Sequence, residues 1–202
     1  MSIEQFENAL STRRSVYALA GTSAVSDAQI VETIKKTVAD VPSAFNARPQ
    51  RVVVLFGDAH RKVWDFALEA LKAVTPAEQF EQSTKPKVES FAAAHGTVLY
   101  FDDVTVTEKL AEQFPPYAAN FPLWAEQAQG SVQFAVWTAL SELGLGANLQ
   151  HYTELIEAKV KEAFDIPATW KLTAQQPFGD IAAPAAARQA EDIDERVKVL
   201  GL

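Results

Sequence analysis

The chain has 202 residues, of which 48% are hydrophobic, so it can form one full core or two small ones. Its net charge of −8 argues against nucleic acid or an anionic membrane as the main partner, because both require a basic face. The sequence has no cysteine, which excludes disulfides, thiolate nucleophiles and cysteine-ligated metals.

We predict an amphipathic helix over residues 3 to about 12, where apolar side chains recur at helical spacing. The helix ends in Ser11-Thr12-Arg13-Arg14-Ser15, so two arginines stand beside three hydroxyls in an acidic protein. Arginine forms forked, charge-assisted hydrogen bonds that match phosphate oxygens, and hydroxyls add neutral donors. The segment is therefore either a phosphate-binding site or a solvated helix end, where the helix dipole favours cations.

A second helix is predicted from the N-cap Ser26 to the residue before Pro42, because a residue that precedes proline is pushed out of the helical region. The loop 42–49 then leads into residues 51–56, a β-branched run typical of a buried strand. In this loop Asn46 either hydrogen-bonds its own backbone or presents its amide to a planar ligand. Loops at the end of a rigid strand often carry binding sites.

Two helical segments are predicted next, over residues 58 to about 74 and 76 to 94, and the second is charged and less regular. Residues 97–101 are predicted to form a strand, and residues 107–114 a short helix. We interpret the acidic pair Asp102-Asp103 as a turn at the strand end, because no third metal ligand stands nearby. The three histidines lack the spacing of a zinc pair, so no metal site is expected.

The longest predicted helix spans residues 121 to about 143. Pro122 fits a first helical turn, and Gly144 and Gly146 end the helix, since glycine enters the left-handed region without penalty. Residues 134–140 are apolar nearly all the way round, so we expect this half to be buried on all sides. One side of the first half is expected to be exposed to solvent, because it carries Glu126, Gln127, Gln129 and Gln133.

Small residues recur along the same helix at spacings of three and four, at Ala128, Ser131, Ala135 and Ala139. Such a stripe lets another helix approach closely. Two interpretations stay open at this point. The segment is either a core helix with an ordinary glycine stop, or a central helix shared between two subunits that delivers the backbone turn 147–152 to a ligand.

A further helix is predicted from residue 153 to about 165, followed by a strand over 169–179. Residues 181–190 are predicted to form an extended arm that lies on a surface. Arg196 and Lys198 point the same way if the last segment is a strand. Apolar strands separated by helices indicate an α+β or α/β sandwich about one mixed sheet.

No apolar run approaches the roughly 20 residues of a membrane span, and acidic residues interrupt the N-terminus, so we expect a soluble, cytoplasmic protein.

Four short motifs occur in order along the chain: Thr12-Arg13-Arg14-Ser15, PSAFN at 42–46, GLGANLQHY at 144–152, and Arg196-Val197-Lys198. Together with FPLW at 121–124, they resemble the FMN-dependent nitroreductase family. The nearest resemblance is to its small fungal and bacterial subfamily of fatty-acid-repression-mutant-like proteins. The resemblance implies a single α+β domain over residues 1–202, with a central mixed, mostly antiparallel sheet flanked by helices. It also implies a homodimer with a long buried helix at its interface and FMN between the subunits.

The resemblance also assigns cofactor contacts. The family's N-terminal segment holds the flavin phosphate and ribityl chain, which carries onto Arg13, Arg14 and Ser15. The family's basic pair near the C-terminus binds the phosphate, which carries onto Arg196 and Lys198. These assignments agree with the charge of the chain, because a flavin phosphate carries about two negative charges and needs local arginines in an acidic protein.

Other contacts carry over to two loops. Asn46 would hold the pyrimidine edge or the ribityl hydroxyls. The backbone of Gln150, His151 and Tyr152 would donate to the flavin near N5 and O4. Where the family often has Asn-Ser-Gln, this chain has Asn46-Ala47-Arg48, so Arg48 either reaches the pyrimidine O2 or faces solvent.

The function implied is that of an oxidoreductase in which NAD(P)H delivers hydride to flavin N5 and leaves, after which a nitroaromatic or quinone is reduced by two electrons in ping-pong fashion. The cofactor carries the chemistry, so no catalytic side chain or metal is required. Aromatic residues of the 114–124 region either wall the substrate pocket or serve as core and dimer contacts. The alternatives are a flavin-binding regulatory or stress-response protein with little turnover, and a structural dimer without cofactor.

Overall fold

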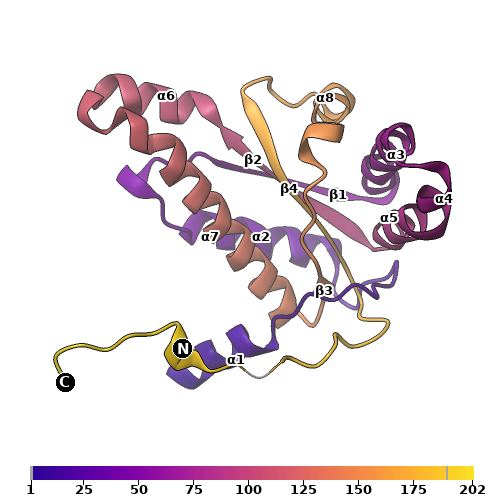
Figure 1. Cartoon of the computed structure of the whole chain (residues 1–202), viewed down its shortest axis with the longest axis horizontal. Coiled ribbons are helices and arrows are strands. Elements are labelled where there is room, and N and C mark those ends of the chain that lie inside the picture. Colours follow the sequence, from indigo (N-terminus) through magenta and orange to yellow (C-terminus); the bar gives the residue numbers. More distant parts are fainter. Residues whose placement is uncertain (1, 190) are drawn as a thin grey trace.

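The computed structural model describes residues 2–189 and 191–202. In these residues, four strands form one antiparallel sheet in the order β1-β2-β4-β3 (Figure 1). The strands are β1 (Gln50–Phe56), β2 (Gly96–Asp103), β3 (Gly146–Ala147) and β4 (Trp170–Gly179). Helices flank this sheet, so the predicted α+β class is confirmed, and the strand pairs are antiparallel throughout.

Helices cover both faces of the sheet (Figure 1). On one face, α2 (Asp27–Asp40) and α7 (Phe121–Glu142) pack against Val98, Tyr100 and other apolar side chains of β2 and β4. On the other face, Leu99 and Phe101 pack against α3 (Gly57–Val74), α5 (Lys85–Ala92) and α8 (Thr153–Phe164). Successive strand residues point to opposite faces, which is why a continuous apolar run suits a strand that is covered twice.

Helix α7 differs from the sequence expectation in both halves. Gln129 and Gln133 are buried, because Gln129 Nε2 donates to Phe101 O (2.8 Å) and Gln133 Nε2 donates to Thr173 Oγ1 (3.4 Å). The expectation that Gln129 and Gln133 are exposed to solvent was wrong. Phe134, in the half expected to be buried all round, is 45% exposed in the single chain.

The predicted helix over 76–94 is divided into α4 (Ala77–Gln79), a π-helical turn η2 (Phe80–Thr84) and α5. Helix α6 (Val104–Gln113) begins directly after β2, earlier than predicted, and the rigid Pro-Pro link is a 3-10 helix, η3 (Pro115–Asn120). Of the helices that the structure describes, none is long and apolar enough to cross a membrane.

The N-terminal helix α1 (Ile3–Thr12) and the C-terminal segment lie together at the end of α7 (Figure 1). The predicted extended arm is confirmed over its described residues, because Ala182 N donates to Ala18 O (2.9 Å) and Leu19 pairs with Ile181; residue 190 lies outside the described residues. Residues after the arm form a 3-10 helix, η4 (Ile193–Glu195), and an exposed tail. The last segment is therefore not a strand.

Candidate cofactor site

Two segments far apart in sequence lie side by side at the end of α7. Val16 N donates to Ala147 O (2.9 Å), and Asn148 Nδ2 donates to Val16 O (2.9 Å). A Cβ on Gly146 would lie within 3.0 Å of the side chains of Leu19, Ile181 and Val16, so this glycine permits the close approach. The structure therefore brings the predicted phosphate-binding segment, residues 13–15, next to the predicted backbone turn.

The side chains of Asn148 and Gln150 connect the turn internally. Asn148 is fully buried, and its Oδ1 accepts a hydrogen bond from Gln150 Nε2 (2.8 Å). The Gln150 main chain exchanges two hydrogen bonds with Gln175 (2.7 and 2.9 Å), which fixes the turn to β4. The sequence reasoning singled out residues 150–152 and missed Asn148 as their anchor.

The backbone donors of this turn are not equally available. Gln150 N donates to Gln175 O, and Tyr152 N donates to Gln175 Oε1 (2.8 Å). Between them, the N–H of His151 has no hydrogen-bond partner in the part of the chain that the structure describes, and its side chain is exposed. Burial, with Tyr17 nearby, raises the pKa of Tyr152, so its phenol stays neutral.

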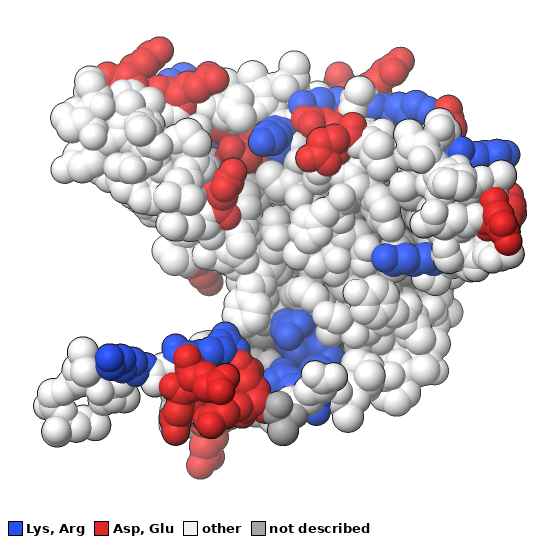
Figure 2. Space-filling model, in the orientation of Figure 1, with Lys and Arg blue, Asp and Glu red and all other residues white. Residues whose placement is uncertain are grey.

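Arginine side chains gather beside this turn. The guanidinium of Arg13 lies over the ring of Trp137, 4.5 Å from its centroid, and Arg13 Nε is buried without a hydrogen-bond partner among residues 2–189 and 191–202. Arg14 Nη2 donates to Ala186 O, and Arg188 Nη2 lies 3.0 Å from Ser11 O. Figure 2 shows basic side chains at the lower edge of the hollowed face, where α1 and the arm lie in Figure 1.

The electrostatics of this cluster favour an anion. Burial, and then the charges of Arg188 and Arg14, lower the pKa of Arg13 from its ordinary value. Within the described residues, none of these arginines forms an ion pair with a carboxylate. Three guanidinium groups without a counter-charge form a ready site for a phosphate, which accepts forked hydrogen bonds.

The predicted loop residues lie elsewhere, at the other end of α7. Arg48 Nε donates to Asn46 Oδ1 (2.9 Å), and Ser43 Oγ accepts from Arg48 N (2.8 Å). Asn46 and Arg48 are both exposed, and both have positive φ values, 51° and 54°. Asn46 thus uses its amide oxygen locally and leaves its NH₂ group toward solvent.

Phe45 holds this loop in its unusual conformation. It also has a positive φ, 57°, and its ring packs among four others at centroid distances of 5.2 to 5.8 Å, those of Phe114, Tyr117, Phe121 and Trp124. A left-handed backbone at a non-glycine residue costs of order 1–3 kcal/mol and persists only where the surrounding packing imposes it. The aromatic cluster supplies that packing.

The two groups of predicted residues do not meet within one chain. Phe45 stacks on Trp124 and Arg13 on Trp137, and these tryptophans are thirteen residues apart on α7, about 20 Å along the helix axis. Arg196 is also apart from the cluster, since it is exposed in the tail and pairs with Glu191. Lys198 is exposed in the same tail, so the role of this basic pair stays a prediction.

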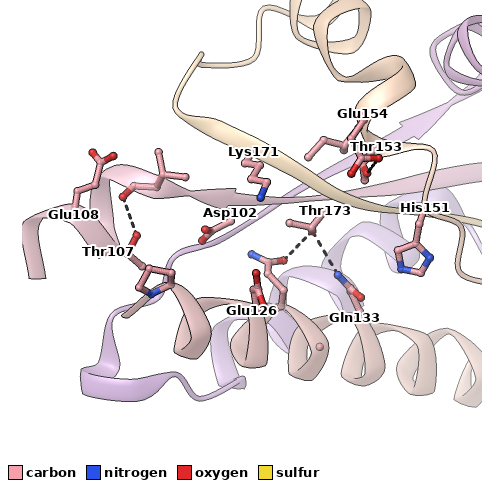
Figure 3. Close-up of a pocket in the computed structure, with 15 residues that line it drawn as sticks. Asp102, Thr107, Glu108, Glu126, Gln133, His151, Thr153, Glu154, Lys171 and Thr173 are labelled. Atoms are coloured by element: carbon pink, nitrogen blue, oxygen red, sulfur yellow. Dashed lines mark hydrogen bonds between the residues drawn. The ribbon is translucent and has the colours of Figure 1, made fainter. Parts of the chain in front are cut away.

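A cavity of about 720 Å³ opens between α7 and the end of the sheet, with His151 on its wall (Figure 3). Lys171 and Asp102 lie side by side on its wall, because they are cross-strand partners of β4 and β2, and Glu126 approaches from α7. Burial, and then the neighbouring Asp103, raise the pKa of Asp102. Most of the charged side chains that line the cavity are acidic, and the cavity adjoins the predicted backbone turn.

A family model described as the Nitroreductase family matches residues 10–180. The chain belongs to the nitroreductase family. HBN1 of Saccharomyces cerevisiae is 39% identical to this chain over 188 residues, which cover 91% of each protein. Nitroreductase FRM2 of the same yeast is 36% identical over 174 residues, 85% of this chain and 86% of FRM2. These fungal relatives confirm the family resemblance predicted from the sequence motifs.

A nitroreductase of known structure shares the fold. Nitroreductase CinD from Lactococcus lactis, in complex with nicotinic acid, has a TM-score of 0.90 at 43% identity and covers 97% of this chain and 100% of its own. Two further structures of CinD, in complex with chloramphenicol and with 4-nitrophenol, have TM-scores of 0.88 and 0.84. The nitroreductase fold of this chain is thereby shown.

The residues of this nitroreductase-family chain fit an FMN phosphate. Arg13 Nε is a buried donor without a partner in the described chain, and the neighbouring guanidinium groups repel one another unless an anion lies between them. The sequence reasoning found Arg13 and Arg14 and missed Arg188. The signal that marks Arg188 is a single arginine in an otherwise apolar, alanine-rich arm.

Proposed function

We propose that this protein is an FMN-dependent oxidoreductase that uses NAD(P)H to reduce nitroaromatic compounds or quinones by two electrons. The observation that carries the proposal is the convergence of Arg13, Arg14 and Arg188 without a carboxylate in the described residues. A phosphate monoester with about two negative charges matches this cluster. When bound, FMN supplies hydride acceptance and two-electron transfer, which side chains cannot provide.

The chain's own residues bind and orient the cofactor in this proposal. Arg13 and Arg14 hold the phosphate, and Ser15, next to them, adds a hydroxyl donor. The N–H of His151 is the backbone donor for the flavin ring, because Gln150 N and Tyr152 N already donate to Gln175. A rigid donor of this kind stabilises negative charge that develops on reduction.

The remaining contacts require a second copy of the chain. An antiparallel pairing of two α7 helices, centred between Gly130 and Ser131, would place Trp124 of one copy opposite Trp137 of the other. The loop with Asn46 and Arg48 would then complete the site beside Arg13 of the other copy. We therefore propose a homodimer whose flavin sites lie between the subunits.

The outer surface of α7 supports this pairing. Leu123, Gln127, Gly130, Ser131 and Phe134 recur every three or four residues and are exposed in the single chain. Such a stripe with a small central residue lets two helices approach closely. Leu123 and Phe134, which are 53% and 45% exposed, gain apolar burial in the dimer.

Small aromatic molecules are the proposed electron acceptors. The CinD complexes hold nicotinic acid, chloramphenicol and 4-nitrophenol, and CinD is more than 40% identical to this chain. The cavity that His151 lines is adjacent to the proposed flavin position and is large enough for a molecule of this size. This combination supports a site that admits an aromatic acceptor beside the flavin.

The visible spectrum tests the proposal directly. The protein is incubated with excess FMN, passed through a gel-filtration column and treated with NADPH or NADH without oxygen. We expect a retained yellow colour that fades with a nicotinamide nucleotide and returns with 4-nitrophenol or a quinone. Arg13→Gln is expected to lose most of the retained FMN.

The other outcomes decide against the proposal in distinct ways. A colourless protein would overturn the cofactor and the reaction together. A yellow protein that neither nucleotide reduces would overturn the enzymatic function and favour a flavin-binding regulatory protein. Light scattering that shows a monomer with full FMN occupancy would contradict the shared site.

A further inference from the structure

The C-terminal arm, residues 181–188, crosses from the end of β4 to the end of α1 (Figure 1). Its first half is held by main-chain hydrogen bonds to residues 18 and 19 and by Ala185, which packs against Val16, Leu19 and Ala94. This apolar contact is small, because alanine contributes little area. The arm therefore needs other contacts to be fixed along its whole length.

The second half is held by arginines. Arg14 Nη2 donates to Ala186 O, which ties the N-terminal segment to the arm. Arg188 Nη2 lies 3.2, 3.0 and 3.4 Å from the carbonyl oxygens of Leu10, Ser11 and Arg13, the last turn and cap of α1. A helix C-terminus presents unpaired carbonyls and a negative dipole end, so a guanidinium is well placed there.

Arg188 is not saturated by these contacts. A guanidinium carries five N–H donors, and only Nη2 of Arg188 has hydrogen-bond partners in the described residues. Nη1 and Nε remain available beside Arg13, whose own Nε is buried and lacks a partner there. Arg188 Nη2 lies 3.4 Å from Arg13 O, and the charge of Arg188, after burial, lowers the pKa of Arg13.

We propose that Arg188 is a further phosphate-binding side chain of this site, and that a bound phosphate monoester fastens the C-terminal arm onto α1. The anion would lie among Arg13, Arg14 and Arg188 and offset their mutual repulsion. The identity of the ligand as FMN rests on the proposed function. The contact of the arm with a phosphate rests on the arginines alone.

Matched variants test the assignment. Arg188→Gln removes the charge and the fork from an exposed side chain, so the variant is expected to fold. Arg61→Gln on α3 removes the same charge from an exposed arginine that pairs with Asp58 and serves as the control. Dissociation constants for FMN and for riboflavin, which lacks the phosphate, are measured by quenching of flavin fluorescence.

We expect Arg188→Gln to weaken FMN binding by about tenfold or more, because charge-assisted hydrogen bonds to the phosphate are lost. Riboflavin binding should change less than about twofold, and Arg61→Gln should leave both constants unchanged. Equal FMN affinity in Arg188→Gln and the wild type would overturn the assignment. An equal loss for FMN and riboflavin would also overturn it, because Arg188 would then act on the structure and not on the phosphate.

Amide hydrogen exchange of the arm separates this inference from the proposed function. FMN, or inorganic phosphate at higher concentration, should slow exchange across residues 182–188 in the wild type and leave Arg188→Gln unaffected. If neither flavin binds but phosphate still protects the arm, the role of Arg188 stands and the FMN proposal fails. If FMN binds and the arm exchanges at the same rate with and without it, the fastening of the arm is wrong.

Discussion

Trp137 of α7 holds Arg13 from one side and the turn after α7 from the other. Its ring centroid lies 4.5 Å from the guanidinium carbon of Arg13, and its Nε1 donates to Ala147 O (3.1 Å). A cation over an indole face is stabilised by about 0.5–2 kcal/mol, depending on how far it is desolvated. One side chain on the central helix thus contacts both parts of the proposed flavin site, the phosphate-binding Arg13 and the turn that faces the flavin ring.

We expect Trp137→Leu to destabilise the protein by about 2 kcal/mol, because it removes the ring under Arg13, the hydrogen bond to Ala147 and part of the buried area. Trp137→Phe keeps an aromatic face and should cost about 1 kcal/mol. Urea unfolding without cofactor measures both. An unchanged midpoint for Trp137→Leu would show that the indole does not support this region, and FMN affinity should fall in the same order as stability.

Asn148 provides a second test of how the turn is held. Its fully buried amide bridges Val16 O and Gln150 Nε2, so Asn148→Ala leaves both groups unpaired. We expect a loss of about 2–3 kcal/mol in the free energy of unfolding. Asn120→Ala is the control, since Asn120 is exposed and makes no side-chain cap bond, and it should change stability by less than about 0.5 kcal/mol. Equal effects of the two substitutions would contradict the bridging role.

The sequence predicts well those elements whose signals lie within a few residues of one another. Helix α2 starts after Ser26, whose Oγ accepts from Gln29 N (3.3 Å), and ends before Pro42, as expected. The buried state of Gln129 was not predictable, because its acceptor, Phe101 O, lies on a different element 28 residues away. Local patterning cannot show such a partner.

The same distinction between local signals and long-range contacts applies to the residues of the candidate site. The motifs around Arg13 and His151 are local and were recognised, and the structure brings them together through Val16 and Asn148. Arg188 was missed because its partners are carbonyls of α1, more than 170 residues earlier in the chain. The composition of the arm marks Arg188 as its single arginine, but it does not show which distant residues that arginine contacts.

His60 gives stability a defined pH dependence. Its Nε2 bonds the carbonyl oxygen of Ala92 (3.0 Å), so Nε2 carries the proton and Nδ1 accepts from Thr97 Oγ1 (2.8 Å), which in turn accepts from Trp64 Nε1 (3.0 Å). A proton added at Nδ1 has no acceptor in this arrangement. Burial is the main cause that lowers the pKa of His60 below 6.5.

In the unfolded chain His60 therefore binds a proton near pH 6.5, whereas in the folded chain it binds one only at lower pH. The resulting stability is fully present above pH 6.5 and is lost as the pH falls toward the lower folded pKa. We expect the free energy of unfolding to decrease between pH 7.5 and pH 5.5, measured by urea unfolding. His60→Gln should be less stable at pH 7.5 and should show a smaller decrease. An identical pH slope in the variant would assign the dependence to another group.

Gly130 separates the behaviour of the single chain from that of the proposed dimer. A Cβ at this position meets nothing within 4 Å in the single chain, and the residue lies in the exposed stripe of α7. Replacing glycine within an exposed helix favours the helical state by up to about 1 kcal/mol. In one isolated chain, both Gly130→Ala and Gly130→Leu should therefore be neutral or stabilising.

In a dimer centred between Gly130 and Ser131, the two substitutions should differ. Gly130→Ala adds one methyl group where the helices cross, whereas Gly130→Leu forces them apart and removes the close packing that the small residue permits. We expect Gly130→Leu to shift the protein toward monomer at micromolar concentration in analytical ultracentrifugation, and to weaken FMN binding because Asn46 and Arg48 of the second copy leave the site. A Gly130→Leu protein that remains dimeric with unchanged FMN affinity would show that α7 does not cross its counterpart at this residue.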